Sequence, residues 1–117
     1  MVHQYRCEIR RVVDGDTVDV DIDLGFGVWL KNERVRIEGV DAPETRTRDM
    51  FEKEKGLAAK EFVQSLLPEG SSQTLISTGF NGKFGRILGD FLVYDPRLDA
   101  ERHLSFMLLT EGHATEY

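Results

Sequence analysis

The sequence has little cysteine and no long apolar run. Cys7 is the only cysteine among the 117 residues, so no disulfide can form within the chain. Its strand-like surroundings favour a small buried residue over a nucleophile. No apolar stretch approaches the ~20 residues of a membrane span, and the first residues lack the apolar segment of a signal peptide. As written, the sequence predicts a soluble, unprocessed, cytoplasmic protein with no membrane partner.

Positive charge is also scarce. The chain has 15 Lys and Arg against 21 Asp and Glu, a formal net charge of -6 and a pI near 5.0. This balance argues against a protein that holds nucleic acid by a broad basic surface. Exposed charges are screened beyond roughly 8 Å at physiological salt, so a few local arginines and a bound cation can outweigh a diffuse negative surface. We therefore expect weak, salt-sensitive binding to a polyanion.

The length fits one domain, over residues 1–117. Segments 5–13 and 16–23 are rich in Val, Ile and Thr and predict strands. The second segment alternates, so one face should be buried and the other should meet water. Val18, Val20 and Ile22 occupy the apolar face, and Asp19, Asp21 and Asp23 occupy the face toward water.

Two carboxylates are exceptions to this division between a buried apolar face and a polar face toward water. Because side chains repeat with period two in a strand, Asp16 shares the apolar face of its strand. Val35, Ile37 and Gly39 repeat in the same way up to Asp41, which also falls on the apolar side at a strand end. Two inward carboxylates at neighbouring strand ends can share an ion.

The rest of the chain predicts a helix, two strands and a second helix. An amphipathic helix is indicated by Ala59, Phe62, Val63, Leu66 and Leu67 and ended by Pro68 and Gly70. Residues 73–79 and 86–94 predict strands joined by a turn at Asn81-Gly82, and 100–110 predict a final helix that stops near Gly112. Five strands with a helix after the third predict an α+β, mostly β domain, and a small barrel would remove the sheet edges.

Three short motifs carry the chemistry: Asp14-Gly15-Asp16, then V-D-A-P-E over 40–44 with Arg36 before it, and Phe84-Gly85-Arg86. Each is common as a turn or strand end on its own. Together they offer carboxylate oxygens suited to calcium, a free glutamate able to act as a base, and planar guanidinium groups that hold phosphate oxygens. The set resembles the active site of the staphylococcal nuclease (thermonuclease) family, and the resemblance spans about Tyr5 to Ala114.

The resemblance implies a five-stranded oligonucleotide-binding-fold barrel with a helix after strand 3 and a C-terminal helix. It implies a calcium-dependent nuclease that hydrolyses DNA, and also RNA, with little sequence preference, to 3′-phosphate ends. Asp16 and Asp41 resemble ligands of Ca²⁺, Ala42 a ligand through its backbone carbonyl, and Asp14 a group that orients the site. We expect a monomer. Relatives are often secreted, although no export signal is visible in this chain.

The resemblance also assigns the groups that act on the phosphate. Glu44 resembles the general base or the residue that positions the attacking water, and Arg36 and Arg86 resemble the pair that neutralises the phosphate. By alternation Arg36 has the opposite parity to Asp41, so only the resemblance places it beside the carboxylates. Both arginines have an alternative interpretation as solvated strand residues. Glu44 also has an alternative interpretation, as a turn cap or as an ion-pair partner of Arg46 or Arg48.

Some positions depart from the family pattern. Lys83, Phe84 and Tyr117 match positions that contact nucleic acid, but Phe84 replaces the usual tyrosine and loses its hydroxyl. The segment 24–31 lengthens a hairpin. We expect its Phe26 and Trp29 to pack on the barrel, and contact with a partner is the alternative.

Two rivals to an enzyme remain open. The first is a catalytically silent relative that binds nucleic acid or protein. The second is a plain calcium-binding domain whose negative surface serves solubility.

Overall fold

The computed structural model describes residues 3–81 and 85–117. The elements in chain order are β1 (His3–Asp14), β2 (Thr17–Gly25), β3 (Val28–Ile37), β4 (Val40–Asp41), α1 (Met50–Leu66), β5 (Ser72–Asn81), β6 (Arg86–Asp95), β7 (Ala100–His103), α2 (Leu104–Thr110) and β8 (Thr115–Glu116). The domain is α+β and mostly β, as the sequence predicts.

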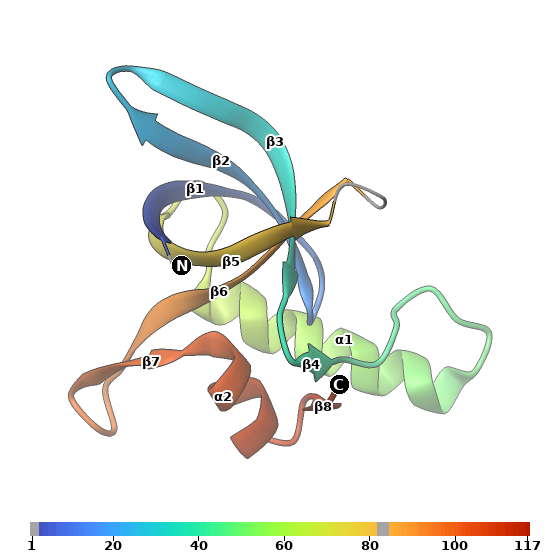
Figure 1. Ribbon diagram of the computed structural model, residues 1–117. Coiled ribbons are helices and arrows are strands. Elements are labelled where there is room, and N and C mark those ends of the chain that lie inside the picture. The colour runs from blue at the N-terminus through green and yellow to red at the C-terminus, as the bar shows by residue number, and fades with distance from the viewer. Residues whose placement is uncertain (1–2, 82–84) are drawn as a thin grey trace.

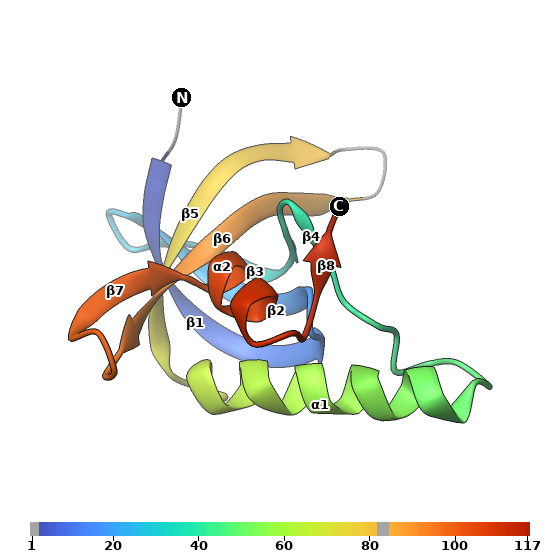
Figure 2. The same ribbon diagram turned by 90° about the horizontal axis from the view of Figure 1, so that it is seen from below.

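Five strands close into a ring. They pair in the order β3-β2-β1-β5-β6, and a parallel pairing of β3 with β6 joins the two ends. Closure of the ring leaves fewer unpaired strand edges, which is the reason for which the sequence favoured a small barrel. The helix α1 follows the third ring strand and runs along one side of the ring (Figures 1 and 2). The predicted arrangement of a strand ring, a helix after its third strand and a C-terminal helix is therefore confirmed.

Alternating apolar side chains fill the ring. Val18, Val20 and Val35 are buried, as the period-two pattern predicts, and Phe91 of β6 is buried with them. Cys7 lies in the same core, and burial raises the pKa of its thiol to about 12. Its full burial confirms the interpretation of Cys7 as a packing residue.

The helix α1 ends where the sequence predicts, and it begins at Met50. The side chain of Asp49 caps it by accepting hydrogen bonds from the backbone N–H groups of Phe51 and Glu52. Ala59 and Val63 face the ring and are buried, and the helix stops before Pro68. Among the described residues, no helix has the length and apolar character needed to cross a membrane.

The prediction of one helix over 100–110 was wrong at its start. Residues 100–103 form β7, which pairs antiparallel with β6, from Leu92 opposite His103 to Asp95 opposite Ala100. Arg102 in this strand approaches the buried carboxylate of Asp95 at 3.3 Å. The helix α2 starts only at Leu104, so strand pairing overrides the helical pattern in the first four residues.

The hairpin that joins β2 and β3 projects away from α1 (Figure 1). Phe26 at its tip is fully exposed and has a φ of 57°, and Trp29 is half-buried, with Nζ of Lys31 5.0 Å from its ring centre. The prediction that Phe26 packs on the barrel was therefore wrong, because the hairpin is long enough to carry its tip clear of the ring.

Asp21 is also placed differently from its predicted position in water. It is buried, and its carboxylate accepts a hydrogen bond from the backbone N–H of Asn32 at 2.9 Å. The β2–β3 register shifts between Val20 and Ile22, and the extra residue on β3 turns this N–H toward Asp21. That hydrogen bond and two cations, Arg10 and Lys31, lower the pKa of Asp21 although burial opposes them.

Candidate active site

The Asp14-Gly15-Asp16 turn places Asp16 inside the domain. The Asp16 side chain accepts hydrogen bonds from the backbone N–H of Ala42 and from the hydroxyl of Thr17, both at 2.9 Å. Only 8% of the residue is exposed, in agreement with its predicted parity. A Cβ on Gly15 would lie 2.8 Å from Cβ of Ala59, so the glycine allows this turn to press against α1.

Asp41 lies at the surface, and the prediction that it faces the interior was wrong. Its side chain is 59% exposed, whereas the preceding Val40 is buried. The strand that the alternation describes is interrupted by a turn at Glu38 and Gly39, where Gly39 has a φ of 83°. The turn resets the alternation, so Val40 takes the inward position and Asp41 the outward one.

Arg36 bridges the two aspartates. Its Nη1 donates to the backbone carbonyls of Ile37 and Val40, each at 2.7 Å. Its Nη2 lies 3.6 Å from Oδ2 of Asp16 and 3.4 Å from Oδ1 of Asp41. The side chain is 16% exposed, so Arg36 is not a solvated strand residue. The same turn that directs Asp41 outward resolves the parity conflict, because it brings Arg36 and Asp41 together.

The loop that follows β4 carries Glu44 and contacts the end of β1. The hydroxyl of Thr45 donates to Oδ1 of Asp14 at 2.6 Å and ties the loop to the end of β1. Glu44 is exposed, and its backbone packs against Gly56 of α1. No ion pair or hydrogen bond joins its carboxylate to a described residue, so among these residues it neither caps the turn nor pairs with Arg46 or Arg48. Nor does a described contact bring Glu44 to the aspartates.

Arg86 begins β6 on the seam where the ring closes. Its Cα partner across the parallel pairing is Arg34. Arg86 lines two hollows, one of 440 Å³ that it shares with Arg36 and Tyr117, and one of 390 Å³ that it shares with Arg46. Arg36 and Arg86 therefore line a common cavity.

The strand β8 lies beside the site, and the sequence alone did not predict this strand. β8 pairs antiparallel with β4, and the backbone N–H of Tyr117 donates to the carbonyl of Gly39 at 3.1 Å. The ring of Tyr117 lies with its centre 5.5 Å from Cζ of Arg36. Two residues of β8 are too few for alternation to show, so no sequence signal indicates the strand. Lys83 and Phe84 lie outside the described residues.

The chemistry of the donor set suits a hard cation. Nη2 of Arg36 lies within 3.6 Å of both carboxylates, Asp16 and Asp41. The candidate ligand atoms of these two side chains are all oxygens, which calcium prefers. Within residues 3–81 and 85–117, no group of three or more His, Cys, Asp or Glu side chains is placed to hold a metal. A calcium ion at this site would therefore take its remaining ligands from water and a backbone carbonyl.

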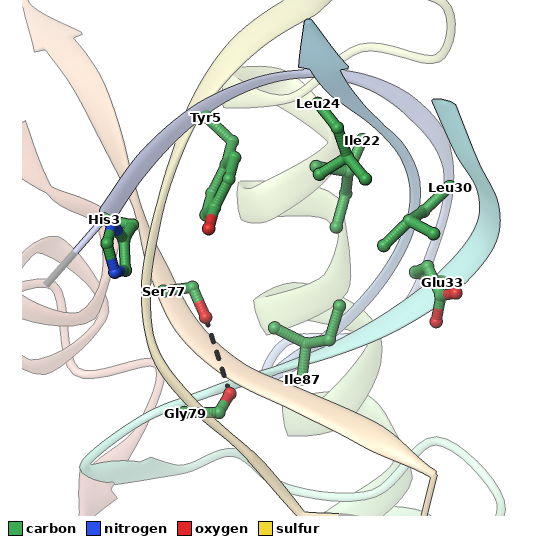
Figure 3. A pocket seen from close by; sticks show the side chains of 9 residues that line it. All are labelled: His3, Tyr5, Ile22, Leu24, Leu30, Glu33, Ser77, Gly79 and Ile87. Carbon is green, nitrogen blue, oxygen red and sulfur yellow. Dashed lines mark hydrogen bonds between the residues drawn. The ribbon is translucent and has the colours of Figure 1, made fainter. Parts of the chain in front are cut away.

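A separate apolar hollow opens at the mouth of the ring. It measures 510 Å³ and is lined by all five ring strands. Tyr5, Ile22, Leu30 and Ile87 point toward one another across it (Figure 3). Of the predicted site residues that lie within 3–81 and 85–117, none lines this hollow, so it is distinct from the arginine and aspartate cluster.

Comparison with known proteins gives two matches. The model of a family described as "Staphylococcal nuclease homologue" matches residues 34–117. A protein named thermonuclease from Staphylococcus intermedius is 34% identical over 80 residues, which make up 68% of this chain and 44% of that protein. The chain thus spans less than half the length of this relative. The family match begins after Asp16, whose position beside Arg36 comes from the fold.

Proposed function

We propose that this chain, which belongs to the staphylococcal nuclease family, hydrolyses phosphodiester bonds of nucleic acid in a calcium-dependent reaction. The observation that carries the proposal is Arg36, whose Nη2 lies 3.6 and 3.4 Å from the carboxylates of Asp16 and Asp41. The same arginine shares a 440 Å³ cavity with Arg86. Anionic ligands for a metal and cationic ligands for a phosphate therefore adjoin each other, which is what hydrolysis of a phosphodiester requires.

The carboxylates supply the metal site in this proposal. Asp16 and Asp41 would hold calcium through their side chains, and Ala42 would hold it through its backbone carbonyl. The hydrogen bonds from Thr17 and Ala42 fix the orientation of the Asp16 carboxylate, and Asp14 holds the loop through Thr45. When bound, calcium would neutralise phosphate charge and favour ionisation of a bound water.

The remaining groups act on the phosphate and on water. Arg36 and Arg86 bind the non-bridging oxygens, where negative charge grows as water adds to phosphorus. Two carbonyl hydrogen bonds hold Arg36 in place, so little reorganisation is needed during the reaction. Glu44 accepts the proton of the attacking water or positions that water. Its exposure, and the absence of a described ionic partner, leave its carboxylate available for this role.

The substrate in this proposal is DNA, and also RNA, with little sequence preference. The groups that face the cavity are arginines, which recognise phosphate and not base edges. Breakage of the bond between phosphorus and the 5′ oxygen then leaves a 3′-phosphate end. Tyr117 offers an exposed ring on which a base can stack beside Arg36.

The test is cleavage of single-stranded DNA at low salt, with calcium titrated against a chelator. We expect calcium-dependent cleavage that falls by about 100- to 1000-fold in Arg86→Ala and in Glu44→Gln. Glu61→Gln, which neutralises an exposed carboxylate on α1, is the matched control and should cleave like the parent. Absence of cleavage at every calcium concentration would overturn the proposal and favour the catalytically silent binding module.

A further inference from the structure

The seam between β3 and β6 carries an unusual pair of like charges. Arg34 and Arg86 are direct Cα partners in the parallel pairing. Because Val35 is buried inside the ring, its neighbours on the strand point outward, so the two arginines share the outer face. Like charges directly opposite each other destabilise a sheet. Asp19 already pairs with Arg34, and an anion bound beside both guanidinium groups would offset more of this repulsion.

A pocket lies beside this pair. It measures 390 Å³ and is lined by Val13, Asp14, Thr17, Arg34, Arg46 and Arg86. We call it the Arg46 pocket. Arg46 comes from the loop that follows Glu44, so the pocket joins the closing seam of the ring to the candidate active site.

Three arginines and one carboxylate line the Arg46 pocket. Arg34 donates two hydrogen bonds to Asp19, at 2.9 and 3.2 Å, which fix its guanidinium in place. Asp14 lines the pocket, and its Oδ1 accepts from Thr45. Three arginines thus stand against the carboxylates of Asp14 and Asp19. Arg46 is exposed and makes no hydrogen bond or ion pair with any residue in the described parts of the chain.

We propose that the Arg46 pocket binds a backbone phosphate of the nucleic acid, next to the phosphate held by Arg36 and Arg86. This inference rests on the proposed function. Arg86 lines both hollows, so the two proposed phosphate positions are neighbours and share this arginine. Arg46 is the main new ligand, and Arg34 adds a fixed positive charge.

The second subsite explains how an acidic chain binds a polyanion. The net charge of -6 is spread over the whole molecule, whereas Arg34, Arg36, Arg46 and Arg86 lie around two adjoining hollows. At physiological salt charges beyond roughly 8 Å are screened, so the potential at the substrate is set by these arginines and by the carboxylates beside them, Asp14, Asp16, Asp19 and Asp41. The subsite also makes the binding affinity depend on the length of the substrate, because a fragment with one phosphate fills only one hollow.

The first experiment measures binding of a fluorescent thymidylate octamer, in a metal chelator, at several salt concentrations. We expect Arg46→Ala to bind about 10-fold more weakly than the parent. The slope of log K against log salt should fall by about 0.7, the value for one phosphate contact with a single strand. Arg48→Ala removes an exposed arginine two residues away that does not line the pocket, and it should change affinity less than twofold.

A second experiment locates the phosphate. Octamers that carry one neutral methylphosphonate at successive positions are bound to the parent and to Arg46→Ala. In the parent, two neighbouring positions should be sensitive. In Arg46→Ala one of these positions should lose its sensitivity while the other keeps it. Equal effects of Arg46→Ala and Arg48→Ala, an unchanged set of sensitive positions, or no binding by the parent would each overturn the proposal.

The outcome is separable from that of the proposed function, because binding is measured without cleavage. If the parent binds through Arg46 but never cleaves, the subsite stands and the nuclease does not. If the parent cleaves and Arg46→Ala behaves like Arg48→Ala, the nuclease stands and the subsite is lost.

Discussion

A Cβ atom placed on Gly56 of α1 would lie 2.5 Å from the backbone carbonyl oxygen of Glu44. The helix and the loop that carries the proposed base are thus in direct backbone contact. The close approach requires a glycine at this position, in the interior of a helix where glycine is otherwise unfavourable.

Gly56→Ala should therefore displace the Glu44 loop. We expect cleavage to fall by roughly 100-fold, since a shift of about 1 Å in a catalytic group has an effect of this size. The overpacking should also lower the free energy of unfolding by about 1–3 kcal/mol. Cleavage rates and denaturant unfolding check the two effects. Gly79→Ala, where a Cβ meets nothing within 4 Å, is the control. Parent-like cleavage in Gly56→Ala would contradict the role of this contact.

Calcium binding and cleavage should separate in two variants of the site. Asp41→Ala removes a proposed ligand, so calorimetry should find weakened calcium binding and the cleavage assay should find no activity. Glu44→Gln removes only the proposed base, so it should keep the calcium affinity of the parent and lose cleavage by about 100- to 1000-fold. Equal calcium affinity in Asp41→Ala and the parent would remove Asp41 from the ligand set.

Arg36→Ala should bind calcium more tightly than the parent, because it removes a positive charge that lies between Asp16 and Asp41. Its cleavage should nevertheless fall by about 100- to 1000-fold through loss of a phosphate ligand. The variant also leaves the carbonyls of Ile37 and Val40 without their donor, which should cost about 1–3 kcal/mol of stability. A lower calcium affinity in this variant would show that Arg36 organises the carboxylates more than it repels the ion.

Stability should depend on pH through Asp21. The N–H of Asn32 and the two nearby cations lower its folded-state pKa below the ordinary value of 3.8. A lowered pKa contributes stability above the unfolded value, and this contribution is lost as the pH falls through the folded value. Asp21→Asn should thus be less stable than the parent at neutral pH, and the gap should shrink below about pH 3.8. Urea unfolding from pH 2 to pH 7 measures this gap, and Glu61→Gln should show no such change.

The hairpin tip should tolerate substitution, in contrast to the core. Phe26 is fully exposed with a φ of 57°, a conformation that asparagine adopts more readily. Phe26→Asn should therefore leave the free energy of unfolding within about 0.5 kcal/mol of the parent or raise it. Phe91→Ala, in the buried core, should lower it by about 3–5 kcal/mol. A large loss in Phe26→Asn would mean that the tip packs in solution.

Some features of this protein were determined by the sequence alone. Period-two alternation identified the ring strands and the buried position of Asp16, and the helical pattern around Ala59 located α1. The residue types at Asp16, Asp41, Glu44 and the arginines indicated the chemistry of the site. The predictions of the strands, of α1 and of the buried Asp16 succeeded because burial of one face is a local property that a short segment expresses. The roles of the site residues stay predictions.

Other features were decided only by the tertiary structure. The turn at Gly39 reversed the expected direction of Asp41 and brought Arg36 to it, and β8 reached β4 from the end of the chain. The parallel pairing that sets Arg34 beside Arg86 joins strands far apart in the sequence. Alternation holds only along an uninterrupted strand, and the pairing of distant segments depends on the whole core. The candidate site is therefore a product of the closed ring, although its chemistry is already present in the residues.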